Sequence, residues 1–218
     1  MSFNHMFYRL FFMVCLLGLN GCTSVTPHLY TELESSTYLR QDSKDGHMPY
    51  SYASVHDFRN YKNMIIKPVV VYEGKDHHFG EMENQDRAAL AKYMQTTFAG
   101  KLGTRFMLVE TPGQDTLELR LTLTGADTNT PILATLSRFD VAGGIYNGIQ
   151  AGTGGEGTFT GYVLYAVELF DSSSSRLLAA YVTKQYPNAW NLGATTGRLA
   201  AAEAGLDNGA DALLAYLE

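Results

Sequence analysis

The sequence predicts an α+β fold, a two-layer sandwich in which a mainly antiparallel sheet carries helices on one face. Two observations lead to this class. One segment alternates strictly between apolar and polar residues, as does a strand with one buried face: Leu117, Leu119, Leu121 and Leu123. Two others, over 84–101 and in the C-terminal 24 residues, carry apolar residues at helical spacing. The predicted order of elements is β-α-β-β-loop-β-β-α.

The first predicted strand runs from Asn63 to Tyr72, because this short run is rich in β-branched residues. Pro68 lies inside it, and since proline donates no ladder hydrogen bond, we expect an edge strand or a bulge there. A short second strand follows over Arg105–Val109, and the alternating segment Leu117–Thr124 is the third. Its even-numbered polar residues are expected to face water.

The first predicted helix spans Asn84–Lys101, with Asn84 as its N-cap. Gly100 or Gly103 can end it in the left-handed conformation. Its apolar stripe is Leu90, Tyr93, Met94 and Phe98.

The C-terminal part is predicted to be a hairpin followed by a helix. Thr158–Phe170, apolar on both faces, pairs with Arg176–Tyr186 across the turn Asp171–Ser175. A link with the only tryptophan, Trp190, leads to a final helix capped by Thr195 or Thr196. Its apolar stripe is Leu199, Leu206, Leu213 and Leu217.

The N-terminus predicts export and lipid attachment. The apolar run Leu10–Leu19 is too short for a membrane-spanning helix, which needs about 20 apolar residues, but fits a signal peptide. The sequence Leu19-Asn20-Gly21-Cys22 resembles the lipobox of bacterial lipoproteins. That resemblance implies a signal peptide over 1–21, cleavage before Cys22, and diacylglycerol and palmitate on the Cys22 membrane anchor. Thr23, in place of aspartate, implies the outer membrane's inner leaflet if the host is Gram-negative.

The rest of the chain divides into a tether and one domain. Residues 22–47 are the acylated tether, predicted from their polar, aperiodic composition, and 48–218 form the single periplasmic domain. Within it, Met48–Lys62 is either an irregular cover over the core or a binding strip. The Gly-rich loop 127–157 is apolar without a period, so it either packs or binds a partner.

Composition excludes several classes of function. The formal net charge is −6 and Lys and Arg are not clustered, which argues against nucleic-acid binding. The chain has two cysteines; Cys15 leaves with the signal peptide and Cys22 is acylated, so we expect no disulfide.

No motif predicts a catalytic, cofactor or metal site. Gly152-x-Gly154-x-x-Gly157 matches the dinucleotide fingerprint as a string, but a strand follows it instead of a helix. His77-His78 beside Asp76 has no third ligand at helical spacing, so a solvated loop is favoured over a metal site. Ser172–Ser175 lacks the Gly-x-Ser-x-Gly pattern of a nucleophile elbow. Glu168 and Asp171 could serve as paired hydrolase carboxylates, but acidic residues are common at a strand end.

Two stretches resemble a known family. They are Tyr50 to Tyr72, with Phe58, Tyr61 and Ile66-Lys67-Pro68-Val69, and the pairing of Glu168-Leu169-Phe170-Asp171 with Leu177-Leu178-Ala179-Ala180. Together they are similar to the bacterial lipoproteins known as domain of unknown function 3313. The resemblance implies an envelope lipoprotein with an α+β domain and carries no catalytic residue.

We therefore expect a lipid-anchored, non-enzymatic envelope protein. It would be a binding or structural accessory of the cell envelope, with an envelope protein partner and with no cofactor. Its binding surface would be a sheet edge or the Gly-rich loop. A periplasmic hydrolase and a lipid- or glycan-binding carrier are the alternatives.

Overall fold

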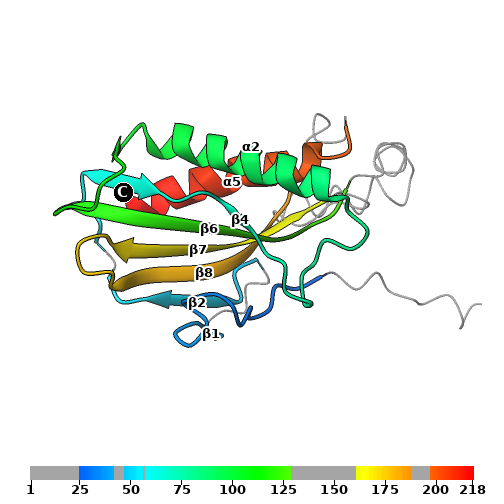
Figure 1. Cartoon of the computed structure of the whole chain (residues 1–218), viewed down its shortest axis with the longest axis horizontal. Helices are drawn as coiled ribbons and strands as arrows, with labels where there is room; N and C mark the ends of the chain where they lie inside the picture. Colours follow the sequence, from blue (N-terminus) through cyan, green and yellow to red (C-terminus); the bar gives the residue numbers. More distant parts are fainter. Residues whose placement is uncertain (1–24, 42–46, 56, 129–160, 188–196) are drawn as a thin grey trace, which may run out of the picture.

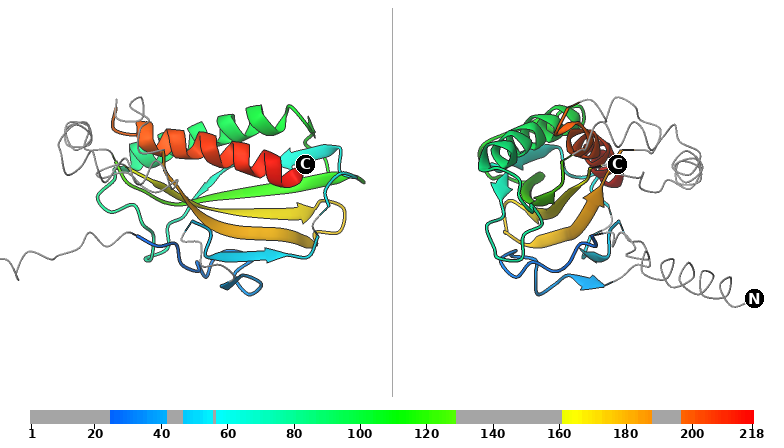
Figure 2. Two further views of the ribbon diagram at one scale, coloured as in Figure 1. Left: turned by 180° about the vertical axis from the view of Figure 1, so that it is seen from behind. Right: turned by 90° about the vertical axis from the view of Figure 1, so that its right-hand side faces the viewer.

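The computed structural model describes residues 25–41, 47–55, 57–128, 161–187 and 197–218. The expectations for the signal peptide 1–21, Cys22, Trp190, and most of the loop 127–157 lie outside these residues. One mixed sheet of eight strands, mostly antiparallel, lies between two helices and an N-terminal segment (Figures 1 and 2). The α+β class, the mainly antiparallel sheet and the helices on one face are confirmed.

The sheet has the order β1-β2-β8-β7-β6-β3-β5, and β4 pairs with β6. Its three longest strands are central and antiparallel: β6 (Thr116–Ala126), β7 (Val163–Asp171) and β8 (Leu177–Gln185). β3 (Asn63–Ile66) and β4 (Val70–Val71) run parallel to β6, and β5 (Met107–Leu108) runs parallel to β3. β1 (Arg40–Gln41) and β2 (Tyr50–Ala53), which the sequence pattern does not predict, extend the sheet beyond β8.

The predicted first strand is interrupted at the proline, which separates β3 from β4. The chain bends away from β6 there, and the Val69 amide donates to Gln95 Oε1 of the neighbouring helix at 2.9 Å instead of to the sheet. The expectation at Pro68 was an edge strand or a bulge. β3 is not an edge strand, since it lies between β6 and β5, and one extra residue lies between the pairs Ile66–Leu119 and Val70–Thr122.

Helices α2 (Asn84–Leu102) and α5 (Ala200–Leu217) cover one face of the sheet. Both helices are confirmed, and three of the four predicted stripe residues of each are buried. The exceptions are Tyr93 of α2 and Leu199, which precedes α5, and both are half-buried. Two details of α2 are wrong, and so is the predicted cap of α5. The N-cap of α2 is Glu83, not Asn84, and Gly103 ends the helix in the right-handed conformation. The N-cap of α5 is Leu199, whereas the predicted caps, Thr195 and Thr196, lie outside the described residues.

The main core lies between the helices and the sheet. Leu117, Leu119, Leu121 and Leu123 all belong to it, as predicted. Phe58 is buried in the same core, which supports the interpretation of 48–62 as a cover, although four of its residues form β2.

A second core lies on the opposite face, and it corrects two expectations. Tyr30, Leu33 and Leu39 are buried there against side chains of β7 and β8. The tether assignment therefore does not hold for residues 25–41, which are packed on the sheet (Figure 2). The face of β6 expected to be wet is also partly covered, since Glu118 and Thr124 are buried. The polar residues on this face of β6 lie under the N-terminal segment, with which Arg120 forms an ion pair through Glu34. The alternation within β6 cannot reveal a cover that comes from another part of the chain.

Candidate functional site

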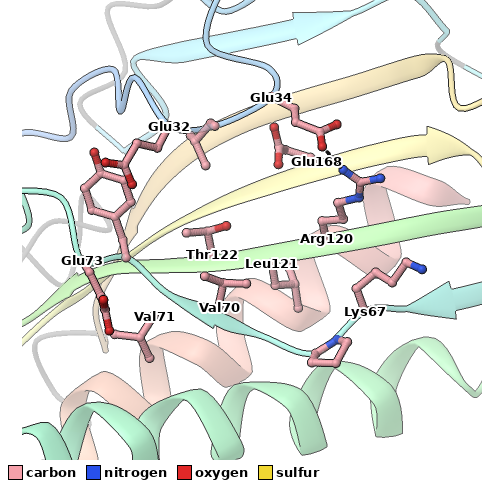
Figure 3. Close-up of a pocket in the computed structure, with 13 residues that line it drawn as sticks. Glu32, Glu34, Lys67, Val70, Val71, Glu73, Arg120, Leu121, Thr122 and Glu168 are labelled. Carbon is pink, nitrogen blue, oxygen red and sulfur yellow. Dashed lines mark ion pairs between the residues drawn. The ribbon is translucent and has the colours of Figure 1, made fainter.

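A pocket of about 510 Å³ lies on the outer face of the sheet, beside the interruption between β3 and β4 (Figure 3). Its walls are β4, β6 and residues 32–34 of the N-terminal segment. Charged and apolar side chains alternate around it, among them Glu32, Glu34, Lys67, Val70, Arg120 and Glu168. It is the candidate functional site.

Strand pleating explains why charged residues face this pocket. The leucines of β6 enter the main core, so Glu118, Arg120 and Thr122 must face the other side of the sheet. Glu168 of β7 is the register partner of Arg120 and lies on the same outer face. The residues around the interruption, Lys67 and Pro68, line the pocket together with Val70 and Val71 of β4.

Arg120 is the centre of an ion-pair network. Its Nε lies 2.7 Å from Glu118 Oε1 and its Nη1 lies 2.5 Å from Glu34 Oε1, and the guanidinium stacks 4.4 Å above the Phe170 ring. Lys67 Nζ approaches the other oxygen of Glu118 at 3.4 Å. Desolvation opposes the charged form most strongly, yet the hydrogen bonds to Glu118 and Glu34 together raise the pKa of Arg120. The network fastens the N-terminal segment to the sheet.

Glu168 and Asp171, considered above as a hydrolase pair, have separate structural roles. Glu168 is buried, and its Oε1 accepts the Ser35 amide at 2.7 Å. Asp171 closes the β7–β8 turn by accepting hydrogen bonds from Ser173, Ser174 and the Tyr61 hydroxyl. These bonds, that of Ser173 first, hold the pKa of Asp171 well below its usual range.

A second group of side chains, which we name the histidine–tyrosine cluster, holds the start of the described chain. It consists of His28, Tyr30, Tyr72, Asp76 and His78. The Tyr30 hydroxyl lies 3.2 Å from His78 Nδ1, and the Tyr72 hydroxyl donates to Asp76 at 2.8 Å. His28 Nε2 lies 3.3 Å from Asp76, and its ring is 4.4 Å from that of Tyr30 and 4.6 Å from that of His78.

Burial shapes the titration of this cluster. It raises the pKa of both Tyr30 and Tyr72 to about 12, with the Asp76 carboxylate contributing to each. Burial and then the nearby His28 ring lower the pKa of His78. Gly125 permits the close approach of the His78 backbone, because a Cβ at Gly125 would lie 2.6 Å from His78 Cβ.

The sequence drew attention to His77, His78 and Asp76 but not to His28 or Tyr30. Within the described residues, no group of three or more histidine, cysteine, aspartate or glutamate side chains is arranged to hold a metal ion. His78 was expected to lie in a solvated loop, but its ring packs against that of Tyr30. The missed partners lie about 48 residues earlier in the chain, in the presumed tether.

The Arg120 ion-pair network and the histidine–tyrosine cluster therefore both hold the N-terminal segment against the sheet. Of the carboxylates that line the pocket, Glu34 binds Arg120 and Glu168 accepts a backbone amide, whereas Glu32 and Glu73 are exposed. Among the described residues, the lining of this pocket contains no serine, cysteine or histidine. The candidate nucleotide glycines 152, 154 and 157 lie outside the described residues. No helix in the described ranges is both long and apolar enough to cross a membrane.

Comparisons with known proteins give one family and a distant fold likeness. The family model described as "Protein of unknown function (DUF3313)" matches residues 30–213. No curated protein matches. Among solved structures, the PelC dodecamer from Paraburkholderia phytofirmans is 11% identical with a TM-score of 0.40, covering 77% of this chain and 91% of that one. A point variant of the same dodecamer is 9% identical with a TM-score of 0.38, covering 77% and 90%.

Proposed function

We propose that this chain, which belongs to the DUF3313 family of proteins of unknown function, is a lipid-anchored protein of the cell envelope that binds a partner and catalyses no reaction. The anchor would be Cys22, and the lipobox-like sequence before it supports this assignment. In a host with two membranes, Thr23 after the cysteine favours the periplasmic leaflet of the outer membrane.

The observation that carries the non-enzymatic proposal is the state of the charged groups in the pocket. A general acid or base must be able to exchange a proton with a substrate, within hydrogen-bond reach. Glu34 and the neighbouring Glu118 instead bind Arg120, and Glu168 binds a backbone amide. The remaining lining carboxylates, Glu32 and Glu73, are exposed. To act on a substrate, Glu34 or Glu168 would have to give up a contact that holds the N-terminal segment on the sheet. The arrangement therefore supports a structural role for these carboxylates.

An open sheet edge supports partner binding. β5 ends the sheet, and β4 pairs with β6 alone among the described strands. Three exposed apolar side chains follow this β4–β5 edge: Val70 is 57% exposed, Met107 69% and Leu108 44%. A strand edge of this kind is a template for the addition of an extended segment, in which backbone hydrogen bonds give affinity and side chains give specificity.

The pocket next to this edge indicates the chemistry of the segment. Glu32 and Glu73 are exposed at the pocket, beside the apolar surface of Val70. We therefore propose an extended polypeptide with apolar and basic side chains as the partner. The alternative hydrolase would need two carboxylates close together and available to a substrate, and a lipid carrier would need an enclosed apolar cavity. Neither alternative predicts a protein crosslink at the β4–β5 edge in the experiment below.

Photo-crosslinking in intact cells tests this proposal. A photoreactive amino acid replaces Val70 or Met107 in the full chain, and Tyr38 is the control because it is also exposed, 49%, but lies next to β1 at the opposite edge. We expect the same crosslinked protein from Val70 and Met107 and none from Tyr38. Crosslinks from Tyr38 alone, or none from the two edge positions, would contradict binding at the β4–β5 edge.

A further inference from the structure

We infer that the domain is held directly against the membrane, with the end that carries the histidine–tyrosine cluster facing the bilayer. This inference rests on the proposed acylation of Cys22. In place of the long tether that was expected, only the short segment between Cys22 and Pro27 connects the lipid to the domain, and it leaves the domain at the histidine–tyrosine cluster. The lipid surface is the partner of this end of the domain.

The connection is short because the chain is fixed soon after the cysteine. Pro27 is buried, His28 contacts Asp76, and Tyr30 is completely buried between Tyr72 and His78. Four residues lie between Cys22 and Pro27, so five Cα–Cα steps connect them. A fully extended chain spans at most about 3.6 Å per residue, so Pro27 lies at most about 18 Å from the acylated residue.

Strand pairing identifies the end of the sheet that this anchor reaches. His78 forms a bridge with Gly125, which is the register partner of Leu164 near the start of β7. The opposite end is marked by the pairing of Leu117 with Asp171. Since strands rise about 3.3 Å per residue, the two ends lie roughly 30 Å apart. The connection is thus too short for the far end to reach the membrane while Pro27 stays bound.

The orientation leaves the proposed partner site accessible. β5 pairs with β3 at Asn63 and Met64, whose partners on β6 are Thr116 and Leu117. The exposed Met107 is therefore at the membrane-distal end of the sheet. A partner segment can bind the β5 part of the edge without displacing lipid, whereas β4, which pairs with Thr122 and Leu123, lies nearer the bilayer.

Fluorescence quenching on vesicles tests the orientation. The acylated full-length mature protein is incorporated into phosphatidylethanolamine–phosphatidylglycerol vesicles that contain a lipid with a nitroxide on its headgroup. One fluorophore is attached through Lys75→Cys, in the exposed turn beside Asp76, or through Gln114→Cys, an exposed residue just before β6. We expect several-fold stronger quenching at position 75. Equal quenching, or stronger quenching at 114, would overturn the inference.

An insertion distinguishes two causes of the orientation, the short connection to the lipid and direct binding of lipid by the protein surface. Twenty Gly and Ser residues between Ser24 and Val25 add a flexible chain of about 25 Å mean extension. We expect the difference between positions 75 and 114 to disappear. A difference that persists would show that the connection is not its cause and would overturn the inference.

Vesicle flotation and the intact mass keep the two proposals distinguishable. A protein that carries no lipid on Cys22 and does not float with vesicles removes both the anchor and the orientation. A protein that is acylated and floats, but is quenched equally at both positions, removes the orientation alone.

Discussion

Tyr30→Ala tests whether the N-terminal segment is part of the folded domain. The Tyr30 side chain is completely buried, its ring contacts His28 and Tyr72 edge-on or tilted, and its hydroxyl bonds His78. Removing a buried aromatic side chain typically costs about 3–5 kcal/mol. Because a domain is stable by only about 5–15 kcal/mol, the loss would be a large share of the total.

The assay is urea unfolding, followed by circular dichroism, of a soluble form that begins at Thr23. Tyr30→Phe removes only the hydroxyl and should cost about 0.5–1.5 kcal/mol. Tyr38→Ala is the matched control on the same segment; its half-exposed ring should cost less than about 0.5 kcal/mol. If Tyr30→Ala changes the free energy of unfolding no more than Tyr38→Ala does, the segment is a tether and the packing described above is wrong.

Three further predictions concern the main core, the faces of β6 and the histidine–tyrosine cluster. Gly209→Ala should destabilise the protein by about 1–3 kcal/mol despite the better helix propensity of alanine, because the new Cβ would overlap the buried Tyr165 hydroxyl; an unchanged thermal midpoint would refute this. Leu121→Ala should cost about 2–5 kcal/mol and Thr122→Ala little, so similar losses in urea unfolding would mean that the faces of β6 are misassigned. Since the pKa of His78 is lowered from its ordinary 6.5 in the folded state, its stabilising contribution is complete above about pH 6.5 and is lost as the pH falls through the lowered pKa. His78→Gln should therefore flatten the dependence of the urea midpoint between pH 7.5 and 5.5, and an unaltered slope would assign that dependence to another group.

The elements that could be predicted from the sequence are those with a local signal. The leucine alternation of β6, the stripes of α2 and α5, and the hairpin around Asp171 are all set by neighbours within a few residues. Pro68 likewise predicts an irregularity in its strand, because proline has no amide hydrogen for the ladder. These features need no knowledge of distant segments.

The N-terminal segment could not be assigned in this way, since its burial depends on a sheet face formed by residues far along the chain. Tyr30, Leu33 and Leu39 have no regular period and lie among polar residues. One signal was available: β7 is apolar on both faces, which is typical of a strand that is covered on both sides. A cover for the second face was therefore required, and 25–41 supplies it.

The candidate site was missed for the same reason. Arg120 was visible as a polar residue of a strand, but its partner Glu34 lies 86 residues earlier in the chain. Glu168 was assessed as a possible acid catalyst, whereas its role depends on the Ser35 amide. Charges that pair across such separations leave no trace in sequence spacing.

Acylation of Cys22 is the central claim, because both the envelope location and the orientation at the membrane depend on it. The direct measurement is metabolic labelling of the parent and of Cys22→Ala with an alkyne fatty acid, followed by mass spectrometry of the N-terminal peptide. We predict a labelled parent whose N-terminal peptide begins at a diacylglyceryl-modified Cys22, and an unlabelled variant that retains residues 1–21 or is cut elsewhere. Equal labelling of the two proteins would contradict the claim.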